Sequence, residues 1–250
     1  MADAEAIAEA ASRPTMRFVA VKSAEKQSQA MVFKTRDLLM TQRTQTINAL
    51  RGHLAEYGVI APKGTHNVDQ LAKALEDPDA TLPLAVIDLG KELLDHLEAL
   101  DERVAALSKR VKEVARTDET ARRLMTIPGI GPICAAAMAA VAPPPSVFTK
   151  GRDFAAWLGL TPKQNSTGGK TRLGETSKMG QRDLRRLLII GAMAVVQQAA
   201  RSGAPAGSWL GRMLARKPKM LVAVALANKI ARVAWALMAG GGVYQAPAAA

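Results

Sequence analysis

A heptad repeat of apolar residues at 93–114 constrains the fold more than any other feature of this chain. Seven aliphatic side chains follow one another at alternating spacings of four and three, with charged residues between them. This spacing places one apolar seam along a helix, which is typical of a coiled coil or an antiparallel helix pair. The seam consists of Leu93, Leu97, Leu100, Val104, Leu107, Val111 and Val114. It predicts pairing with another long helix, either within the chain or across a dimer.

A suitable partner helix is predicted upstream, over residues 24–57. Ser23 precedes it as an N-cap, because its hydroxyl can accept a hydrogen bond from a free amide of the first turn. Gly58 follows it at the left-handed position that ends many helices. Shorter helices are expected over residues 1–12 and about 67–77.

After residue 117 glycine, proline and basic residues separate shorter apolar helices. Apolar residues make up 48% of the chain and aromatic residues only 4%, which favours helices over a β-sandwich. Helices are predicted over 117–126, 132–141, 151–158, 180–201, about 207–215 and 219–239. Residues 16–22 are expected to form a short strand or an extended link, and no strand is expected after residue 30. The predicted fold class is all-α: long helices in a coiled-coil linker, then a compact basic helical domain.

The positive charge is confined to one half of the chain. Residues 1–116 hold 16 Lys and Arg against 17 Asp and Glu, whereas residues 117–250 hold 18 against 5, so the net charges are −1 and +13. Such asymmetry favours a polyanionic partner, most often nucleic acid. A solubility device and a membrane-surface face are the alternatives.

Membrane insertion and secretion are not expected. No apolar run approaches 18 residues without a charge, and the acidic N-terminus lacks the basic start of a signal peptide. The single cysteine, Cys134, excludes an internal disulfide and any cysteine-cluster metal site. These features predict a cytoplasmic protein without a membrane partner.

The segment 124–141, "LMTIPGIGPICAAAMAAV", has the pattern of a helix-hairpin-helix element. Its glycines allow the backbone to approach a ligand closely, and the next helix begins with unpaired amides. Such a turn can grip a DNA backbone without recognising its sequence. The predicted phosphate-binding residues are Gly129, Ile130 and Gly131, and a plain helix–helix turn is the alternative.

The segment 161–174, "TPKQNSTGGKTRLG", is predicted to be a basic loop. Residues 150–186, which surround this loop, contain only three carboxylates but nine cations. The cations are Lys150, Arg152, Lys163, Lys170, Arg172, Lys178, Arg182, Arg185 and Arg186. These cations can neutralise phosphates. A Ser or Thr hydroxyl in such a loop can act as a nucleophile on a phosphodiester, although a Ser-Thr-Gly-Gly run is also common in ordinary loops.

No metal site is predicted from spacing. The histidines, His53, His66 and His96, lie far apart in the neutral half, and no His, Cys and Asp cluster has ligand spacing.

Two stretches resemble one family of enzymes. "LMTIPGIGP" and "FTKGRDFAAWLGLTPKQNSTGGKTRLGETSKMGQRDLRRLLIIGA" are similar to the C-terminal domain of the DEDD-type insertion-sequence transposases. These are the bridge-RNA-guided recombinases of the insertion-sequence one-ten and eleven-eleven groups. The match is dense over about 120–200. Upstream, "ADAEAIAEAASRPTMRFVAVKS" resembles the end of the family's RuvC-like domain.

The resemblance implies a division of the chain. Residues 1–22 would be a remnant of the RuvC-like domain, 23–116 a helical coiled-coil linker, 117–240 the C-terminal transposase domain, and 241–250 a disordered tail. The family's RuvC-like domain supplies four acidic ligands for Mg²⁺, and only Asp3 matches one of them. The chain therefore resembles a family member that lacks its N-terminal part, and it is not expected to cleave DNA with metal on its own.

The resemblance also implies a serine nucleophile in the loop after "GLTP". That position falls on Thr167 without gaps, and on Ser166 if the loop is shifted by one; Ser166 is preferred because the β-branch of threonine narrows the approach. The path of the nucleic acid would be lined by Lys163, Lys170, Arg172, Lys178 and Arg182. The implied partners are DNA, a guide RNA and further copies of the chain, bound through the coiled coil.

Three functions follow as alternatives. The first is a transposase or recombinase that forms a covalent link with DNA. The second is a catalytically inactive nucleic-acid-binding remnant, and the third is a helical scaffold whose charge keeps it soluble.

Overall fold

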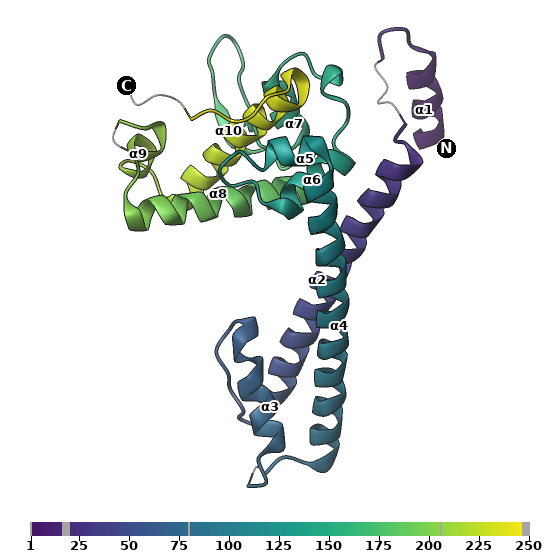
Figure 1. Cartoon of the computed structure of the whole chain (residues 1–250), viewed down its shortest axis with the longest axis vertical. Coiled ribbons are helices and arrows are strands. Elements are labelled where there is room, and N and C mark those ends of the chain that lie inside the picture. Colours follow the sequence, from purple (N-terminus) through teal and green to yellow (C-terminus); the bar gives the residue numbers. More distant parts are fainter. Residues whose placement is uncertain (1, 17–20, 80, 206, 247–250) are drawn as a thin grey trace.

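A computed structural model describes residues 2–16, 21–79, 81–205 and 207–246. It has a long helical stem and a compact helical head, with the N-terminal helix standing apart (Figure 1). The elements, in chain order, are α1 (Ala2–Ser12), α2 (Ala24–Ala55), η1 (Thr65–Asn67), α3 (Val68–Glu76), α4 (Leu84–Thr117), α5 (Glu119–Leu124), α6 (Pro132–Val141), η2 (Pro145–Val147), α7 (Gly151–Trp157), β1 (Pro162–Gln164), β2 (Leu173–Thr176), α8 (Arg182–Ser202), α9 (Trp209–Leu214) and α10 (Lys219–Gly240). We call α2, α3 and α4 the stem and α5 to α10 the head.

The stem is an antiparallel helix pair, with α3 packed at its far end (Figure 1). The heptad seam of α4 faces α2, and its members Leu97, Leu100, Val104 and Val111 are buried there. Ser23 caps α2 as predicted, accepting a hydrogen bond from the Lys26 amide at 3.3 Å. An ion pair between Arg43 and Asp101 also joins the two helices. The seam is thus covered by pairing within the chain, one of the two arrangements that its spacing allows.

The head packs around α10, which contacts α5, α7, α8 and α9. Its core combines large side chains such as Phe154 and Leu188 with small ones, and most of the buried positions of α6 and α10 are alanines. The upper ends of α2 and α4 join this core through Phe33 and Val111. An ion pair between Arg186 of α8 and Asp37 of α2 ties the head to the stem.

Arg36 lies beside this ion pair and donates a hydrogen bond to the Ser108 hydroxyl at 2.7 Å. Burial lowers the pKa of Arg36, and the neighbouring charge of Arg186 lowers it further.

The mainly α-helical fold class is confirmed, and the helices whose ends were predicted begin and end within about two residues of those positions. For α4 only the seam at 93–114 was predicted, and the helix extends from Leu84 to Thr117. The prediction of no strand after residue 30 is wrong, because β1 and β2 form a short antiparallel hairpin. Strands of three and four residues are too short to give a periodic pattern. The strand or link proposed for 16–22 falls largely on residues 17–20, outside the described part of the chain.

One helix, α10, is long and apolar enough to cross a membrane by length and composition alone. Core helices pass the same test, and α10 buries Val222, Ala227 and Ile230 against its neighbours in the head. Its composition is therefore weak evidence for a membrane span.

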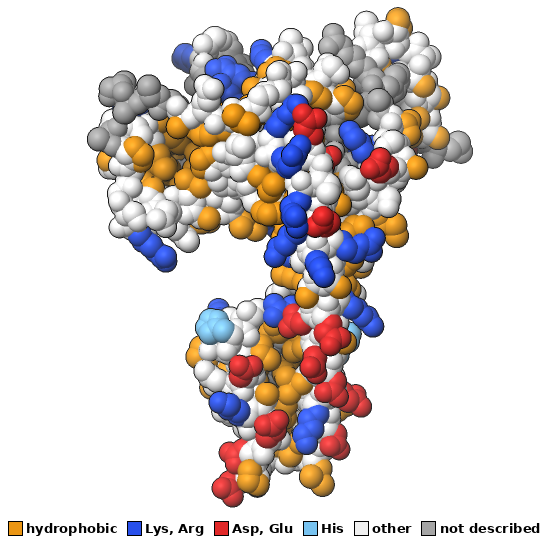
Figure 2. All heavy atoms as spheres, in the orientation of Figure 1, with side chains coloured by type: hydrophobic (Ala, Val, Ile, Leu, Met, Phe, Trp, Pro, Cys, Tyr) orange, Lys and Arg blue, Asp and Glu red, His pale blue; other side chains and the backbone are white. Residues whose placement is uncertain are grey.

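Charge follows the same division as shape. Figure 2 shows acidic side chains gathered on the far half of the stem and basic side chains around the head and its junction with the stem. The sequence predicted this asymmetry, and the fold turns it into a separation in space.

Candidate nucleic-acid interface

The basic segment 161–174 lies mostly in an exposed β-hairpin that projects from the head (Figure 1). Pro162 pairs with Thr176 and Gln164 with Leu173, in antiparallel register. At the tip, Thr167 and Lys170 flank two glycines with φ of +55° and +76°, a conformation that side chains other than glycine rarely adopt. The segment is thus an ordered hairpin with hydroxyls and cations along it.

The two candidate nucleophiles have different surroundings. The Ser166 hydroxyl accepts a hydrogen bond from the Arg172 amide at 3.0 Å and donates one to the Gln164 side chain at 3.2 Å. A hydrogen bond donated to an oxygen stabilises negative charge on it, as a nucleophile requires. At Thr167 the backbone carbonyl accepts from the Lys170 amide at 3.0 Å, in the tip turn. The geometry therefore favours Ser166 over Thr167.

The predicted phosphate-binding cations are gathered in one region. All five side chains are exposed, on the hairpin, directly after it, or on the first turn of α8: Lys163, Lys170, Arg172, Lys178 and Arg182. Lys178 has a φ of +56°, a strained conformation for a residue with a side chain, and its amide donates to the Gly159 carbonyl at 3.2 Å. A strained cation at the end of a projecting hairpin is consistent with a binding role.

The base of the hairpin is held by a residue whose role the sequence did not indicate. Arg185 is buried, and its guanidinium donates to the carbonyls of Leu158 at 2.9 Å and Met179 at 3.4 Å. These carbonyls lie on the two chain segments that enter and leave the hairpin. A Cβ at Gly159 would lie 1.9 Å from the Met179 carbonyl oxygen, so only glycine permits this approach. Arg185 therefore positions the hairpin rather than contacting a ligand.

The turn between α5 and α6 holds the three predicted phosphate-binding residues, but they are used differently. The Ile130 side chain is buried, and its amide donates to the Ile127 carbonyl at 3.0 Å inside the turn. Gly129 packs on α8, where a Cβ on Gly191 would lie 1.8 Å from the Gly129 carbonyl oxygen. Gly131 is exposed, with open space around its Cα. The turn is thus part of the head core on one side and open on the other.

Asp3, the one predicted metal ligand, is exposed on α1 and stands apart from the hairpin (Figure 1). Among the described residues, no three His, Cys, Asp or Glu side chains come together as a metal-binding group. The described residues therefore do not supply the cluster of oxygen ligands that a Mg²⁺ site needs.

A family model matches residues 121–205, which include the α5–α6 turn, the hairpin and α8. Its description is "Transposase IS116/IS110/IS902 family".

Three similar proteins are each named as transposases. A Sinorhizobium fredii protein is 44% identical over 98% of this chain and 63% of its own length. A Pseudomonas aeruginosa protein is 45% identical over 97% of this chain and 72% of its own length. The transposase for the insertion sequence element IS1328 of Yersinia enterocolitica is 37% identical over 97% of this chain and 72% of its own length. The chain thus spans about two thirds of the length of these relatives.

Proposed function

The chain belongs to the IS116/IS110/IS902 family of transposases, and on this premise we propose that it binds DNA and takes part in the movement of an insertion sequence. The observation that carries the proposal is the hairpin, which lies inside the segment that the family model matches. It combines a hydrogen-bonded serine hydroxyl with exposed cations on one projecting element. That combination suits a phosphodiester, whose charge needs cations and whose phosphorus needs an oxygen nucleophile.

The chemical step of the proposal is a transesterification at a DNA phosphate. The Ser166 Oγ bonds to phosphorus, a P–O bond to one nucleoside breaks, and the freed nucleoside oxygen takes up a proton while the serine proton passes to solvent. The Arg172 amide, which already donates to the Ser166 Oγ, lowers the cost of charge on that oxygen. The product is a covalent protein–DNA link that a second strand can later resolve.

The covalent link is tested by incubating the chain with labelled duplex DNA from the ends of the insertion sequence and separating the products on a denaturing gel. An adduct that Ser166→Ala abolishes and Thr167→Val keeps would support Ser166 as the nucleophile. The reverse pattern would assign Thr167, and an adduct that survives both substitutions would remove the hairpin from the chemistry.

DNA binding through the hairpin has its own test in a salt titration. If all five cations contact phosphates, the plot of log Kobs against log salt should have a slope of about −4 to −5. Lys170→Ala with Arg172→Ala should reduce that slope by about two. The matched control, Lys73→Ala with Lys91→Ala, removes two exposed stem cations and should leave the slope unchanged. An affinity that does not change with salt would refute the DNA-binding proposal.

A second candidate function is nucleic-acid binding without strand cleavage. Asp3 is the one residue that matches the family's four acidic ligands, and no three His, Cys, Asp or Glu side chains of the described residues form a metal-binding group. Salt-dependent DNA binding with no adduct under any condition would favour this candidate over the first.

Further features of the proposal come from the resemblance. The first is a helix-hairpin-helix role for the α5–α6 turn, in which the Gly129 and Gly131 amides would bind a phosphate. The second is binding of a guide RNA, and the third is self-association through the stem. The fourth is Mg²⁺ held by a DEDD-type set of carboxylates in longer relatives. The exposed backbone at Gly131 supports the first of these. Sedimentation of the chain alone and with RNA tests the second and third.

A further inference from the structure

An open groove of about 610 Å³ lies on the head, between α9, α10 and the start of α7. Its lining residues are Gly151, Trp209, Ala225, Asn228, Lys229, Arg232, Val233, Trp235 and Ala236. Two of these are tryptophans, two are cations, and none of the described lining residues carries a carboxylate. The volume is in the range of small-ligand sites.

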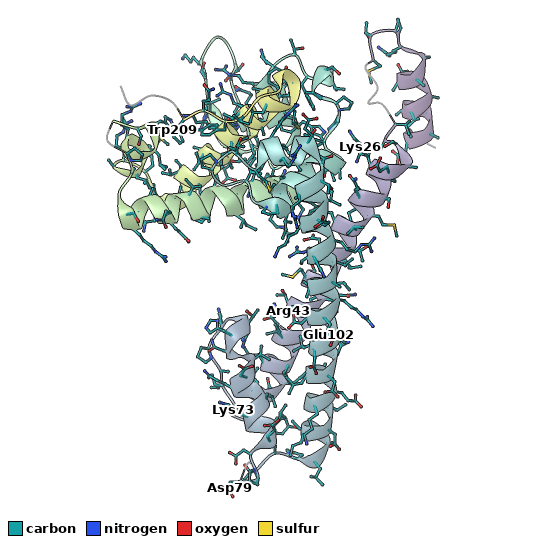
Figure 3. The ribbon with its side chains drawn as sticks, viewed as in Figure 1. Lys26, Arg43, Lys73, Asp79, Glu102 and Trp209 are labelled. Atoms are coloured by element: carbon teal, nitrogen blue, oxygen red, sulfur yellow. The ribbon has the colours of Figure 1, made fainter. Side chains whose placement is uncertain are left out.

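The aromatic and cationic groups of the groove are arranged together. The Lys229 ammonium lies 5.0 Å from the centre of the Trp209 ring, a cation–π contact. Arg232 is one helical turn further along α10 and therefore lies on the same face as Lys229. Figure 3 shows Trp209 on α9, at the edge of the head far from the stem. The groove thus presents two positive charges beside a partly exposed indole.

The second tryptophan and the floor of the groove are fixed in place. The indole N–H of Trp235 donates to the Pro145 carbonyl at 3.1 Å. Gly151 packs so closely on α10 that a Cβ there would lie 3.1 Å from the Arg232 carbonyl oxygen. A preformed groove loses little conformational entropy when it binds a ligand.

We infer that this groove binds a single-stranded stretch of nucleic acid, with a backbone phosphate at Lys229 and Arg232 and an unpaired base stacked on Trp209. Single-strand sites combine a positively charged path with aromatic faces, because each base has a flat apolar face and each linkage carries one negative charge. The absence of carboxylates among the described lining residues adds charge complementarity to a polyanion. A nucleotide fits these groups, because its base can stack on a flat ring and its phosphate can bind the two adjacent cations.

The groove is linked to the hairpin through one hydrogen bond. The Asn228 side chain lines the groove and donates to the Leu160 carbonyl, directly before the hairpin, at 3.1 Å. Strand exchange creates unpaired nucleotides, and a groove next to the hairpin can hold them clear of the reacting phosphate. The inference thus rests on the proposed function and adds a second, single-strand site to it.

Fluorescence anisotropy tests the inference with the intact chain at fixed salt. The probes are labelled oligomers of about ten nucleotides, oligo-dT and oligo-rU, and a labelled duplex. Trp209→Ala should weaken single-strand binding by about five- to 100-fold, the effect of losing one stacked base. Lys229→Ala with Arg232→Ala should weaken it at least tenfold, whereas duplex binding should change less than threefold in both variants.

Two controls separate stacking and local charge from general effects. Trp209→Phe keeps an aromatic face and should restore most of the single-strand affinity. Arg201→Ala with Lys217→Ala removes two exposed cations of the same half of the chain that lie outside the groove, and it should affect single strand and duplex alike. Thermal unfolding followed by tryptophan fluorescence confirms that each variant is folded.

The outcomes are distinguishable. Selective loss of dT binding, rU binding or both, with duplex binding kept, supports the groove and identifies the strand it takes. Equal loss on single strand and duplex, or no loss on either, overturns the inference. A wild-type chain that binds duplex but no single strand overturns it and leaves the proposed function standing, whereas one that binds no nucleic acid removes both.

Discussion

The stem and the head bury their cores in different ways. The far end of the stem packs large aliphatic side chains of three helices, among them Leu50, Leu54 and Leu71, each no more than 1% exposed. The head also buries large side chains such as Phe154 and Leu188, but it adds alanine-rich faces on α6 and α10 and close backbone contacts at glycines. We therefore expect the stem to tolerate changes on its surface, whereas the head is sensitive to a single added carbon where two backbones touch.

The difference also bears on function. Residues 23–116, which form the stem and its loops, carry 14 of the 22 acidic residues and no tryptophan. The head carries the excess positive charge and all three tryptophans, Trp157, Trp209 and Trp235. Tryptophan fluorescence therefore reports on the head alone, while far-UV circular dichroism reports on the helices of both. The two signals let each region be perturbed and followed separately.

The largest effect is expected from Leu54→Ala in the stem core. Leu54 is 1% exposed, and removing its side chain leaves a cavity that costs about 2–5 kcal/mol. In urea the dichroism transition should begin at lower concentration, while the midpoint of the tryptophan transition stays in place. The matched control is Leu38→Ala on the same helix, where 57% exposure predicts a change under about 0.5 kcal/mol. If both signals shift together, the stem and head unfold as one unit and the comparison fails.

The next largest effect is expected from Gly191→Ala in the head. The added Cβ would lie 1.8 Å from the Gly129 carbonyl oxygen, so the backbone of α8 or of the turn must move. Overpacking of this kind costs about 1–3 kcal/mol, and the tryptophan transition should move to lower urea by a corresponding amount.

The control for Gly191 is the helical glycine Gly52 of α2. A Cβ there meets nothing within 4 Å, and Gly52→Ala should stabilise the stem by up to about 1 kcal/mol. Opposite signs for the same substitution in the two regions would sharpen the comparison, and equal small gains would contradict it.

The helices of both regions were predictable because their signals are local. The heptad seam identified α4, the cap at Ser23 identified the start of α2, and glycines and prolines separated the helices of the head. Local signals did not decide which helix covers the seam, because periodicity along one chain does not identify the partner. They also missed the hairpin, whose strands are too short for a pattern.

The candidate site was predictable only as a set of residue types. Composition and resemblance pointed to Ser166, Thr167 and the cations around them. The roles of Arg185 and Gly159 depend on carbonyls brought close by tertiary packing, which no spacing in the sequence encodes. The aromatic groove was missed for the same reason, since Trp209 and Lys229 lie 20 residues apart and meet only after α9 and α10 pack.

An effect of similar cost but confined to the hairpin is expected from Arg185→Met, which tests how the head holds its hairpin. The substitution keeps the apolar stem of the side chain but leaves two carbonyls, of Leu158 and Met179, without their donor, at a cost of about 1–3 kcal/mol. Local opening should expose the hairpin to trypsin, which cleaves after Lys163, Lys170 and Arg172. Arg182→Gln, an exposed change three residues away, should leave the digestion rate unchanged. Equal protection in both variants would show that Arg185 does not hold the hairpin.

The smallest expected signal is the alkylation of Cys134 in α6, which reports on local opening of the head. Burial raises the pKa of its thiol from 9.0 to about 12, so at pH 8 the reactive thiolate is about a thousandfold rarer than at an ordinary cysteine. Because the thiolate fraction grows with pH, alkylation by iodoacetamide should remain negligible at pH 8 and become measurable only towards pH 12 or when the head opens.

The same alkylation distinguishes the two regions without unfolding either fully. Gly191→Ala should speed labelling at pH 8, because the strained head opens more often, and Leu54→Ala should not, because its cavity lies in the stem. Mass spectrometry of the labelled chain measures both rates. Faster labelling in Leu54→Ala would mean that loosening the stem core propagates through α2 and α4 into the head, where Phe33 and Val111 complete the same core as Cys134.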